Sequence, residues 1–539
     1  MSGFRSPEIP REQLVLWEQR LEEAIPLDHP VRLLDKLLRS SAFAQTFKDW
    51  ESEYDLTEGQ PPYQPRDLAV LYIYGTMNRL RSSRQQEAAC HNRLDVIWLM
   101  SGQHPDHATI AGFVKKHGKR LRQLYVEVLK VAAAAGLVKL EHVAYDGTKI
   151  AADAGKGSVQ NKDELAAELR AVDERLKALE REWEENERRE QGLPGNEFTC
   201  AVPSSAPLPR RMAQLKERQE RLERALKNIE RRVTASVKSE KPKPITSATD
   251  PDSRVMRSKE GGSRPNYNAQ IGVDAGKGMI VAAEVCDEAE DSAQLVPLLE
   301  QTQQNTGQLP VEVSADGNYT TGPNLAALEE KKVTGYLPSG AEHAEEAVAA
   351  QCAPKADGDQ AATQSQSTNA PGTVSSAAWA RLPKNSEGCF TKDAFSYDSQ
   401  ADVYRCPMGQ TLTFRGASKG QKNYGPTERR TYACGACCQC AHWKECCKNP
   451  KTGRSVKRDQ YDPQRERLRA RMATPEAQER YQVRKKTVER RFGLIKHVLG
   501  VRRFLHRGLE AVRTEWMIIC TAVNLGVLLR EWARVKLVL

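Results

Sequence analysis

The chain has 539 residues, 39% of them hydrophobic and 28% charged, which excludes a fibrous or wholly disordered protein and leaves room for two to four domains. Its 81 Lys and Arg residues outnumber 71 Asp and Glu residues, for a formal charge of +10. Residues 1–12 are polar, unlike a signal peptide, so secretion is not expected. The most apolar stretch, 516–529, contains Thr521 and Asn524 and is shorter than the ~20 residues that span a bilayer, so membrane insertion is not expected either.

Residues 1–135 are predicted to form a helical N-terminal domain. Asp28-His29-Pro30 is typical of a helix start, and four leucines follow at helical spacing. Further helices are expected after Pro65, over 87–100 and over 107–135. Short helices joined by tight turns are compatible with helix-turn-helix DNA binding, although a plain helical bundle would show the same periodicity.

A strand and then a charged insertion are predicted next. Residues 142–145, in the first core segment 136–155, are strand-like and end at Asp146. In the insertion 156–240, apolar residues recur at alternating spacings of four and three on both sides of a Pro-rich loop, which predicts an antiparallel coiled-coil hairpin. The residues of the two predicted seams are Leu165, Leu169, Val172, Leu176, Leu179, Trp183, Leu222, Leu226, Ile229 and Val233.

Residues 241–340 alternate between strand and helix signals. Strands are predicted over 267–273, 278–285, 310–314 and 333–337, and helices over 292–304 and 323–332. Asp316 lies immediately beyond the third of these strands. The order of elements predicts an α/β fold with a mixed sheet.

A low-complexity linker at 341–385 and a cysteine-rich insertion at 386–450 follow. The chain has 13 cysteines, six of them between 434 and 447, a distribution that fits intracellular thiols or a metal site better than a disulfide framework. A zinc site is predicted, with Cys434 and His442 as alternative ligands, and metal-free thiols remain the alternative. Its proposed ligands are Cys406, Cys437, Cys440 and Cys446.

The last segment, 451–539, is predicted to complete the core with a basic helix at 475–499 and an apolar helix at 509–538. Between residues 451 and 508 there are 18 Lys and Arg residues against 6 Asp and Glu residues. Such a positive stripe attracts polyanions, and nucleic acid is the leading candidate. A solvated basic helix is the alternative.

Three carboxylates, taken together in their order along the predicted strands and the basic helix, suggest a metal site. Asp146 and Asp316 are predicted at the ends of strands, where active sites of mixed sheets collect, and Glu489 lies within the basic helix. Carboxylate oxygens are the ligands that Mg²⁺ prefers. Two such ions would activate a water or a 3′-hydroxyl and stabilise the leaving oxygen.

The segments around these carboxylates resemble one known family. They are Tyr145–Ala152, Asp250-Pro251 with Arg254 and Met256, Tyr267–Gln270, Val273-Asp274, Ser314–Tyr319, and Tyr481, Arg484, Glu489 and Lys496 around Phe492-Gly493; Tyr63–Pro65 and Arg84–Glu87 add to them in the N-terminal domain. The chain is similar to the DDE transposases of bacterial insertion sequences, in particular to the group numbered eleven-eighty-two, related to the IS-four/IS-five superfamily.

The resemblance implies a ribonuclease-H-like core and cut-and-paste DNA transposition, by strand hydrolysis at the element's ends and transfer of the 3′-hydroxyl. It implies Mg²⁺ or Mn²⁺ bound by Asp146, Asp316 and Glu489, double-stranded DNA (terminal inverted repeats and target) as partner, an active homodimer, and a place in the bacterial cytoplasm at the nucleoid. The residues expected to hold the DNA backbone are Tyr481, Arg484, Lys485, Lys496, Arg502, Arg503 and Arg507.

One spacing departs from the broader superfamily. Four residues separate Arg484 from Glu489 instead of three, and Lys485 stands at the three-residue position. On a straight α-helix Arg484 would point about 140° away from Glu489, so either cation can be the one beside the site.

Two other functions stay open: an inactive DNA-binding regulator of the same fold, and a metal-dependent nuclease without strand transfer.

Overall fold

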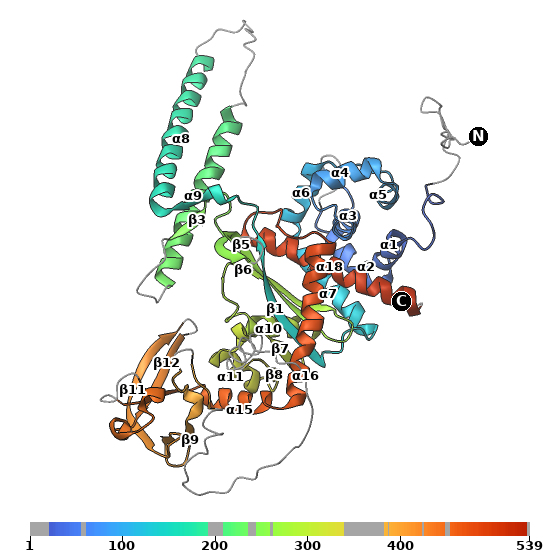
Figure 1. The fold of residues 1–539 in the computed structure, drawn as a ribbon. Helices are drawn as coiled ribbons and strands as arrows, with labels where there is room; N and C mark the ends of the chain where they lie inside the picture. The colour runs from blue at the N-terminus through green and yellow to red at the C-terminus, as the bar shows by residue number, and fades with distance from the viewer. Residues whose placement is uncertain are drawn as a thin grey trace, which may run out of the picture.

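The computed structural model describes residues 21–54, 61–191, 208–235, 244–258, 262–338, 382–385, 388–422, 425–447 and 453–535. Most of the linker predicted at 341–385 lies outside these residues. In Figure 1 the N-terminal helices lie on one side of a central sheet, a pair of long helices projects away from it, and a smaller sheet lies at the other end.

The N-terminal region is helical, as predicted. Pro30 and Pro65 each occupy the first turn of a helix, where a missing N–H costs nothing. The predicted helix over 107–135 is two helices that meet at His117, whose buried ring accepts a hydrogen bond from Trp50 Nε1 at 3.0 Å. The helices are α1 (Pro30–Leu38), α2 (Ser41–Glu51), α3 (Pro65–Met77), α4 (Ser83–Asn92), α5 (Leu94–Leu99), α6 (His107–Lys116) and α7 (Gly118–Ala134).

The central sheet is mixed, which confirms the predicted α/β class. Its order is β4-β5-β1-β7-β8, with β6 also paired to β5. Strand β1 is antiparallel to β5 and parallel to β7, so it lies in the middle of the sheet. The strands are β1 (His142–Ala151), β4 (Arg254–Ser258), β5 (Gly262–Asp274), β6 (Ile280–Cys286), β7 (Glu312–Ala315) and β8 (Thr334–Tyr336).

The prediction that the first strand ends at Asp146 is wrong. Strand β1 continues to Ala151 because residues 147–151 stay paired with residues 266–270 of β5. Only its pairing with β7 stops earlier, at Tyr145. Asp146 therefore lies within β1, at the point where that strand parts from β7.

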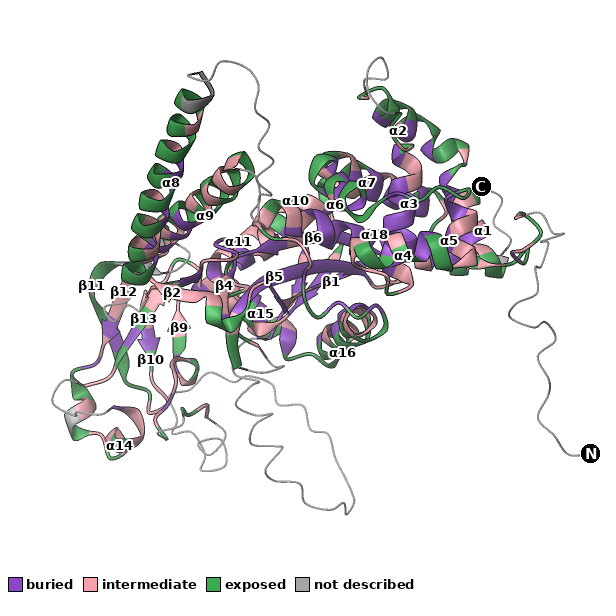
Figure 2. Cartoon of the chain, turned by 90° about the horizontal axis from the view of Figure 1, so that it is seen from above, coloured by how far each residue is buried: buried purple, intermediate pink, exposed green. Residues whose placement is uncertain are grey.

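Helices cover both faces of the sheet. Figure 2 shows α10 (Leu295–Thr306) and α18 (Leu509–Val535) on one side of β1 and β5, and α15 (Asp462–Met472) and α16 (Pro475–Arg484) on the other. Helix α11 (Gly322–Glu330) packs against α15 and β8. The sheet is thus the middle layer of the domain.

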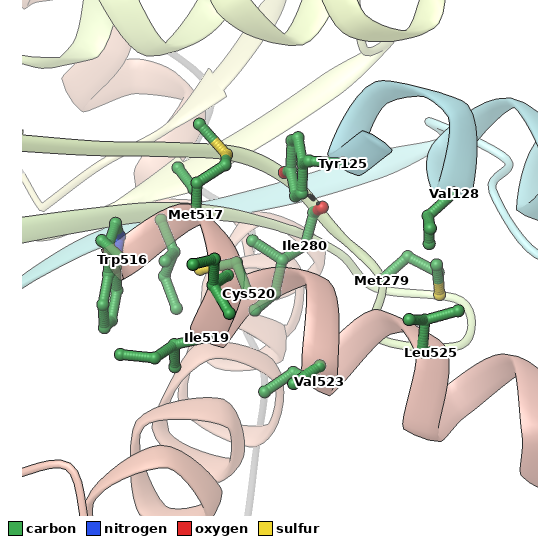
Figure 3. Close-up of a cluster of buried hydrophobic side chains, with 14 of the residues drawn as sticks. Tyr125, Val128, Met279, Ile280, Trp516, Met517, Ile519, Cys520, Val523 and Leu525 are labelled. Carbon is green, nitrogen blue, oxygen red and sulfur yellow. Dashed lines mark hydrogen bonds between the residues drawn. The ribbon is translucent and has the colours of Figure 1, made fainter. Parts of the chain in front are cut away.

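Helix α18 is the main apolar core element. It is long and apolar enough to cross a membrane by length and composition, but 89% of its most apolar window is buried inside the fold. Figure 3 shows Cys520 of α18 beside Ile280 of β6, whose carbonyl accepts a hydrogen bond from the Tyr125 hydroxyl of α7 at 2.6 Å. The polar residue Asn524 is accommodated there because its side chain pairs with both the N–H and the C=O of Ile280, at 2.8 and 2.9 Å.

Replacing Asn524 with alanine is expected to lower the free energy of unfolding by about 2 to 3 kcal/mol, because the Ile280 N–H would lose its partner inside the core. Urea denaturation measures the change. Thr521→Ala is the matched control, since the Thr521 hydroxyl donates to the Met517 carbonyl of its own helix, whose loss should cost about 1 kcal/mol or less. Equal effects of the two substitutions would contradict this account.

The predicted hairpin consists of two long helices, α8 (Lys162–Gln191) and α9 (Leu208–Ala235). Their seam buries most of the predicted apolar residues, but Trp183 is 38% exposed, so the buried seam ends before it. Coiled-coil geometry of this seam stays a prediction. Short elements connect the hairpin to the core: η1 (Lys156–Ser158), β2 (Val159–Asn161) and β3 (Ile245–Ser247).

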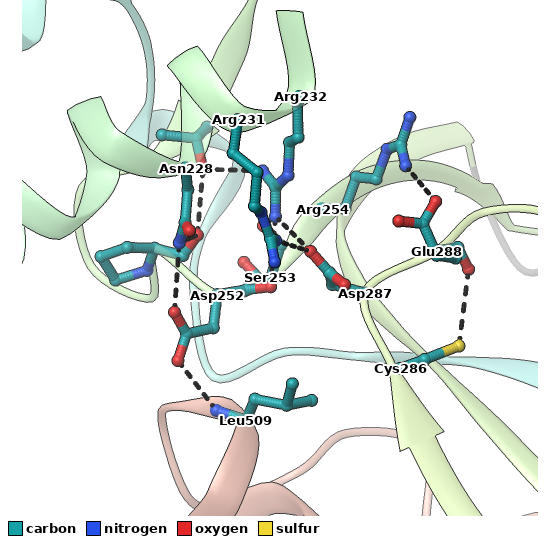
Figure 4. Close-up of polar contacts among 12 residues, drawn as sticks. Asn228, Arg231, Arg232, Asp252, Ser253, Arg254, Cys286, Asp287, Glu288 and Leu509 are labelled. Carbon is teal, nitrogen blue, oxygen red and sulfur yellow. Dashed lines mark hydrogen bonds and ion pairs between the residues drawn. The ribbon is translucent and has the colours of Figure 1, made fainter. Parts of the chain in front are cut away.

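Polar contacts fix the base of the hairpin to the core (Figure 4). Arg231 and Arg232 of α9 both bind Asp287 Oδ2, at 2.6 and 3.2 Å. Asn228 donates to Asp252, whose other oxygen accepts from the Leu509 N–H at the start of α18. The hairpin is therefore held by ion pairs and hydrogen bonds at its base.

The cysteine-rich segment forms a separate sheet of order β13-β12-β11-β10-β9. Its small core contains Phe390, Tyr404, Leu412 and Tyr432. Its elements are η3 (Lys392–Ala394), β9 (Ser396–Asp398), β10 (Val403–Arg405), β11 (Thr411–Lys422), β12 (Gly425–Ala433), η4 (Ala436–Gln439), α14 (Trp443–Cys446) and β13 (Ser455–Asp459).

The predicted basic helix over 475–499 is continuous but not uniformly α-helical. After α16 come a π-helical turn η5 (Lys485–Glu489), the short helix α17 (Arg490–Gly493) and a second π-helical turn η6 (Leu494–Val498). π-helical turns bond residue i to residue i+5 and often occur at functional sites. They change which side chains share a face of this helix.

Candidate active site at the edge of the central sheet

Asp146 and Asp316 are brought together by the register of two neighbouring strands. The last parallel pair between β1 and β7 is Tyr145 with Ala315, so the next residue of each strand is a carboxylate. Adjacent strands lie ~4.8 Å apart. The two aspartates are therefore neighbours at the edge where β7 ends.

Both aspartates are fixed by their local backbone. Asp316 precedes the short helix η2 (Gly317–Tyr319), and its Oδ1 accepts the Gly317 N–H at 2.7 Å. Asp146 Oδ1 accepts the Gly147 N–H in the same way at 2.8 Å. Each carboxylate thus has one oxygen bound to the amide that follows it.

Arg484 binds the other oxygen of Asp146. Its Nη1 lies 2.8 Å from Asp146 Oδ2, and both side chains are largely buried. The guanidinium also lies 5.6 Å from the centre of the Tyr481 ring. Arg484 was expected on the DNA backbone, but the structure places it against a candidate catalytic carboxylate.

The electrostatic environment makes Asp146 an unusual carboxylate. Burial raises its pKa to about 6, and the neighbouring carboxylates Asp316 and Asp291 act in the same direction, while Arg484 opposes them. A carboxylate whose negative charge is destabilised by burial and by other carboxylates favours a nearby cation. Such perturbed groups concentrate at functional sites.

Asp291 is a further carboxylate beside the site that sequence reasoning missed. Its Oδ1 accepts hydrogen bonds from Asn268 Nδ2 at 2.6 Å and from Gln270 Nε2 at 2.7 Å, and Lys149 Nζ lies 3.3 Å away. The available signal was the spacing of Asn268 and Gln270, which places two amides on one face of a buried strand. Buried amides need partners, and Asp291 supplies one.

Glu489 is not assembled with the two aspartates. Its side chain is exposed on η5, and within the described ranges no three His, Cys, Asp or Glu side chains form a group that could hold a metal. Residues 485–489 form a π-helical turn instead of part of an α-helix. The straight α-helix assumed for this spacing is therefore wrong.

The other residues expected to bind DNA lie along the same helix and the loop after it. Lys485, Arg502 and Arg503 are exposed, and Tyr481 and Lys496 are half-buried. Arg507 is paired with Asp153, just beyond β1, at 3.0 Å. Its charge is therefore partly neutralised by the protein.

The four predicted zinc ligands surround one small cavity of about 30 Å³, which Cys434 and His442 also line. Burial raises the pKa of the Cys446 thiol to about 12 and raises that of Cys406 and Cys437, whereas zinc requires thiolates. None of these side chains joins a group of three that could hold a metal in the described part of the chain. The cavity is thus lined by residue types that bind zinc, but in the described part of the chain they do not form a zinc site.

Two family models match the chain. One, described as "Transposase domain (DUF772)", covers residues 19–116, and the other, described as "Transposase DDE domain", covers residues 405–529. The second match includes Glu489 but neither Asp146 nor Asp316. No curated protein matches the chain. Together the two matches support an insertion-sequence transposase, a function that implies a DNA substrate.

Proposed function

We propose that the protein is a DDE-type DNA transposase that cleaves DNA at the ends of an insertion sequence and transfers the liberated 3′-hydroxyl to target DNA. The observation that carries the proposal is the β1–β7 register, which makes Asp146 and Asp316 neighbours beside Arg484. The strand order β6-β5-β1-β7-β8, with β1 antiparallel to β5 and parallel to β7, supports a ribonuclease-H-like core.

The donor set at this edge fits a hard divalent cation. Asp146 and Asp316 offer carboxylate oxygens at one place, and Asp146 already binds one cation there, the guanidinium of Arg484. Asp146, Asp316 and, after a local movement of its helix, Glu489 would hold Mg²⁺ or Mn²⁺. The chemistry supplied by such bound ions is activation of the attacking water or 3′-hydroxyl and stabilisation of the leaving oxygen.

The surrounding cations would hold the DNA. Tyr481, Lys485 and Lys496 lie on the helix that carries Arg484, and Arg502 and Arg503 extend the basic surface. Contacts of this kind position the duplex without reading its sequence. The helical N-terminal domain would contact the terminal inverted repeats, and joining two ends requires at least a homodimer, acting on DNA in the bacterial cytoplasm.

The direct test is an assay on DNA that carries the element's terminal inverted repeats, with Mg²⁺ present. Strand transfer supports the proposal. Nicking without transfer would instead indicate a metal-dependent nuclease, and binding without cleavage an inactive regulator.

The pKa of Asp146 predicts the pH dependence of cleavage. A carboxylate must be ionised to bind a metal, and Asp146 becomes protonated as the pH falls through about 6. The rate should therefore fall about tenfold per pH unit below pH 6 and level off above it. Single-turnover rates from pH 5 to pH 8 at fixed, subsaturating Mg²⁺ measure this, and a flat profile down to pH 5 would exclude Asp146 as the titrating ligand.

Zinc binding by Cys406, Cys437, Cys440 and Cys446 stays a separate proposal. It requires these thiols to ionise and to move together. The zinc content of the purified protein, compared with that of Cys440→Ser, tests it: about one zinc ion that the variant lacks supports the site, and equal contents contradict it.

A further inference from the structure

A second basic site lies beside the helix that carries Arg484 and Glu489. It is a cavity of about 260 Å³ between three elements: the β5–β6 turn at 275–278, the helix segment 486–491 and the end of α18. Six cationic side chains and one carboxylate line it: Lys277, Lys486, Arg490, Arg491, Arg530, Arg534 and Glu531. None of them belongs to the residues proposed above to hold metal or DNA.

Most of this positive charge is not neutralised by the protein. Glu531 pairs with Lys277 at 2.8 Å and with Arg534 at 3.3 Å. Over the described ranges no carboxylate pairs with the other four cations, Lys486, Arg490, Arg491 and Arg530. Like charges held together in a concave surface focus a positive potential and attract an anion.

Arg491 shows that the fold holds these charges together at an energetic cost. Burial, together with the nearby Arg530 and Arg490, lowers its pKa to about 10. Its Nη2 donates to the Lys277 carbonyl at 2.8 Å, so the guanidinium is fixed in place. Gly278, at φ +74°, allows this contact, because a Cβ there would lie 2.1 Å from Arg491 Nη2.

We infer that this cavity binds a phosphate group of the DNA backbone, separate from the scissile one; the inference rests on the proposed transposase function. A volume of about 260 Å³ lies at the lower end of the range of ligand pockets and leaves room for one phosphate group. Arginines are suited to phosphate because their planar donors match its oxygens.

The position of the cavity fits one DNA duplex that runs through both sites. Asp274 lies opposite Val143 and Ile271 opposite Asp146, so the turn begins three residues, or about 10 Å, along the sheet from Asp146. Along the helix, Arg491 follows Arg484 by seven residues, which is also about 10 Å. At 3.4 Å per base pair, this offset corresponds to about three base pairs.

The test measures the affinity of the full-length protein for duplex DNA over a range of salt concentrations. Arg490→Gln combined with Arg530→Gln removes two exposed cations from the cavity. Arg175→Gln combined with Lys177→Gln, on the exposed surface of α8, is the charge-matched control. Loss of one phosphate contact should lower the log–log salt slope by about 0.9 and weaken binding roughly fivefold to tenfold at 150 mM salt.

The expected result is this loss in the cavity variant, wild-type behaviour in the control, and recovery of the slope in Arg490→Lys with Arg530→Lys. A cavity variant that keeps the wild-type slope while wild-type protein binds and cleaves DNA would overturn the inference and leave the proposed function intact. Inorganic phosphate that raises the melting temperature of wild type, but not of the cavity variant, without competing with DNA would show a free-phosphate site and overturn it as well. A wild-type protein that binds no DNA would overturn both.

Discussion

Replacing Asp316 with alanine is expected to reduce the rate of strand cleavage by about a thousandfold or more, while DNA affinity stays within a few-fold of wild type. Asp316 lies beside Asp146 at the end of β7, where it would supply an oxygen ligand to the divalent ion. Metal stabilisation of the reacting oxygens is worth several kcal/mol, and about 4 kcal/mol corresponds to a thousandfold in rate.

Single-turnover cleavage and a binding isotherm on the same DNA measure the two effects separately. Glu330→Ala is the matched control, because Glu330 is an exposed carboxylate at the end of α11, the helix that follows Asp316. It should cleave at the wild-type rate. Cleavage that survives Asp316→Ala would remove Asp316 from the mechanism.

Replacing Arg484 with glutamine is expected to lower the free energy of unfolding by about 3 kcal/mol at pH 7, since breaking a buried ion pair leaves a charge without a partner. Asp146 would lose the cation that holds down its pKa. The pKa of Asp146 is raised to about 6 in the folded state. Its ionised form therefore lowers the free energy of unfolding above pH 6, and this penalty disappears as the pH falls and the carboxyl becomes protonated. The loss should therefore be larger at pH 7 than at pH 5.

Urea denaturation at both pH values measures the stability change, and the pH–rate profile provides a second readout. Because Arg484 lowers the pKa of Asp146, the fall in cleavage rate should begin at a higher pH in Arg484→Gln than in wild type. Arg484→Lys retains the charge without the planar donors and should keep the profile closer to wild type. Identical profiles for wild type and Arg484→Gln would show that the two side chains are not coupled.

The placement of the two aspartates could be predicted because it depends on local patterns. Short strand-like segments, 142–145 and 310–314, precede Asp146 and Asp316, and residues just beyond the last pair of two parallel strands meet at one place in the sheet. The extent of β1 could not be predicted in this way. Residues 147–151 are held in the strand by pairing with β5, a long-range contact that their own sequence does not specify.

The geometry around Arg484 depended on features that the sequence does not show. A uniform α-helix was assumed for the spacing of Arg484 and Glu489, but η5 is π-helical, so that spacing does not give the relative direction of the two side chains. The ion pair with Asp146 joins residues 338 positions apart and becomes visible only in the tertiary structure. The same holds for Asp291, whose role follows from amides on β5.

Binding of Mn²⁺ to the protein–DNA complex, followed by electron paramagnetic resonance, tests the central claim most directly, because the claim is that Asp146, Asp316 and Glu489 together hold divalent ions on DNA. The account predicts bound Mn²⁺ in wild type and a loss of at least tenfold in its affinity in Asp146→Asn, in Asp316→Asn and in Glu489→Gln, with DNA still bound. Undiminished Mn²⁺ affinity in any of these three variants would contradict it.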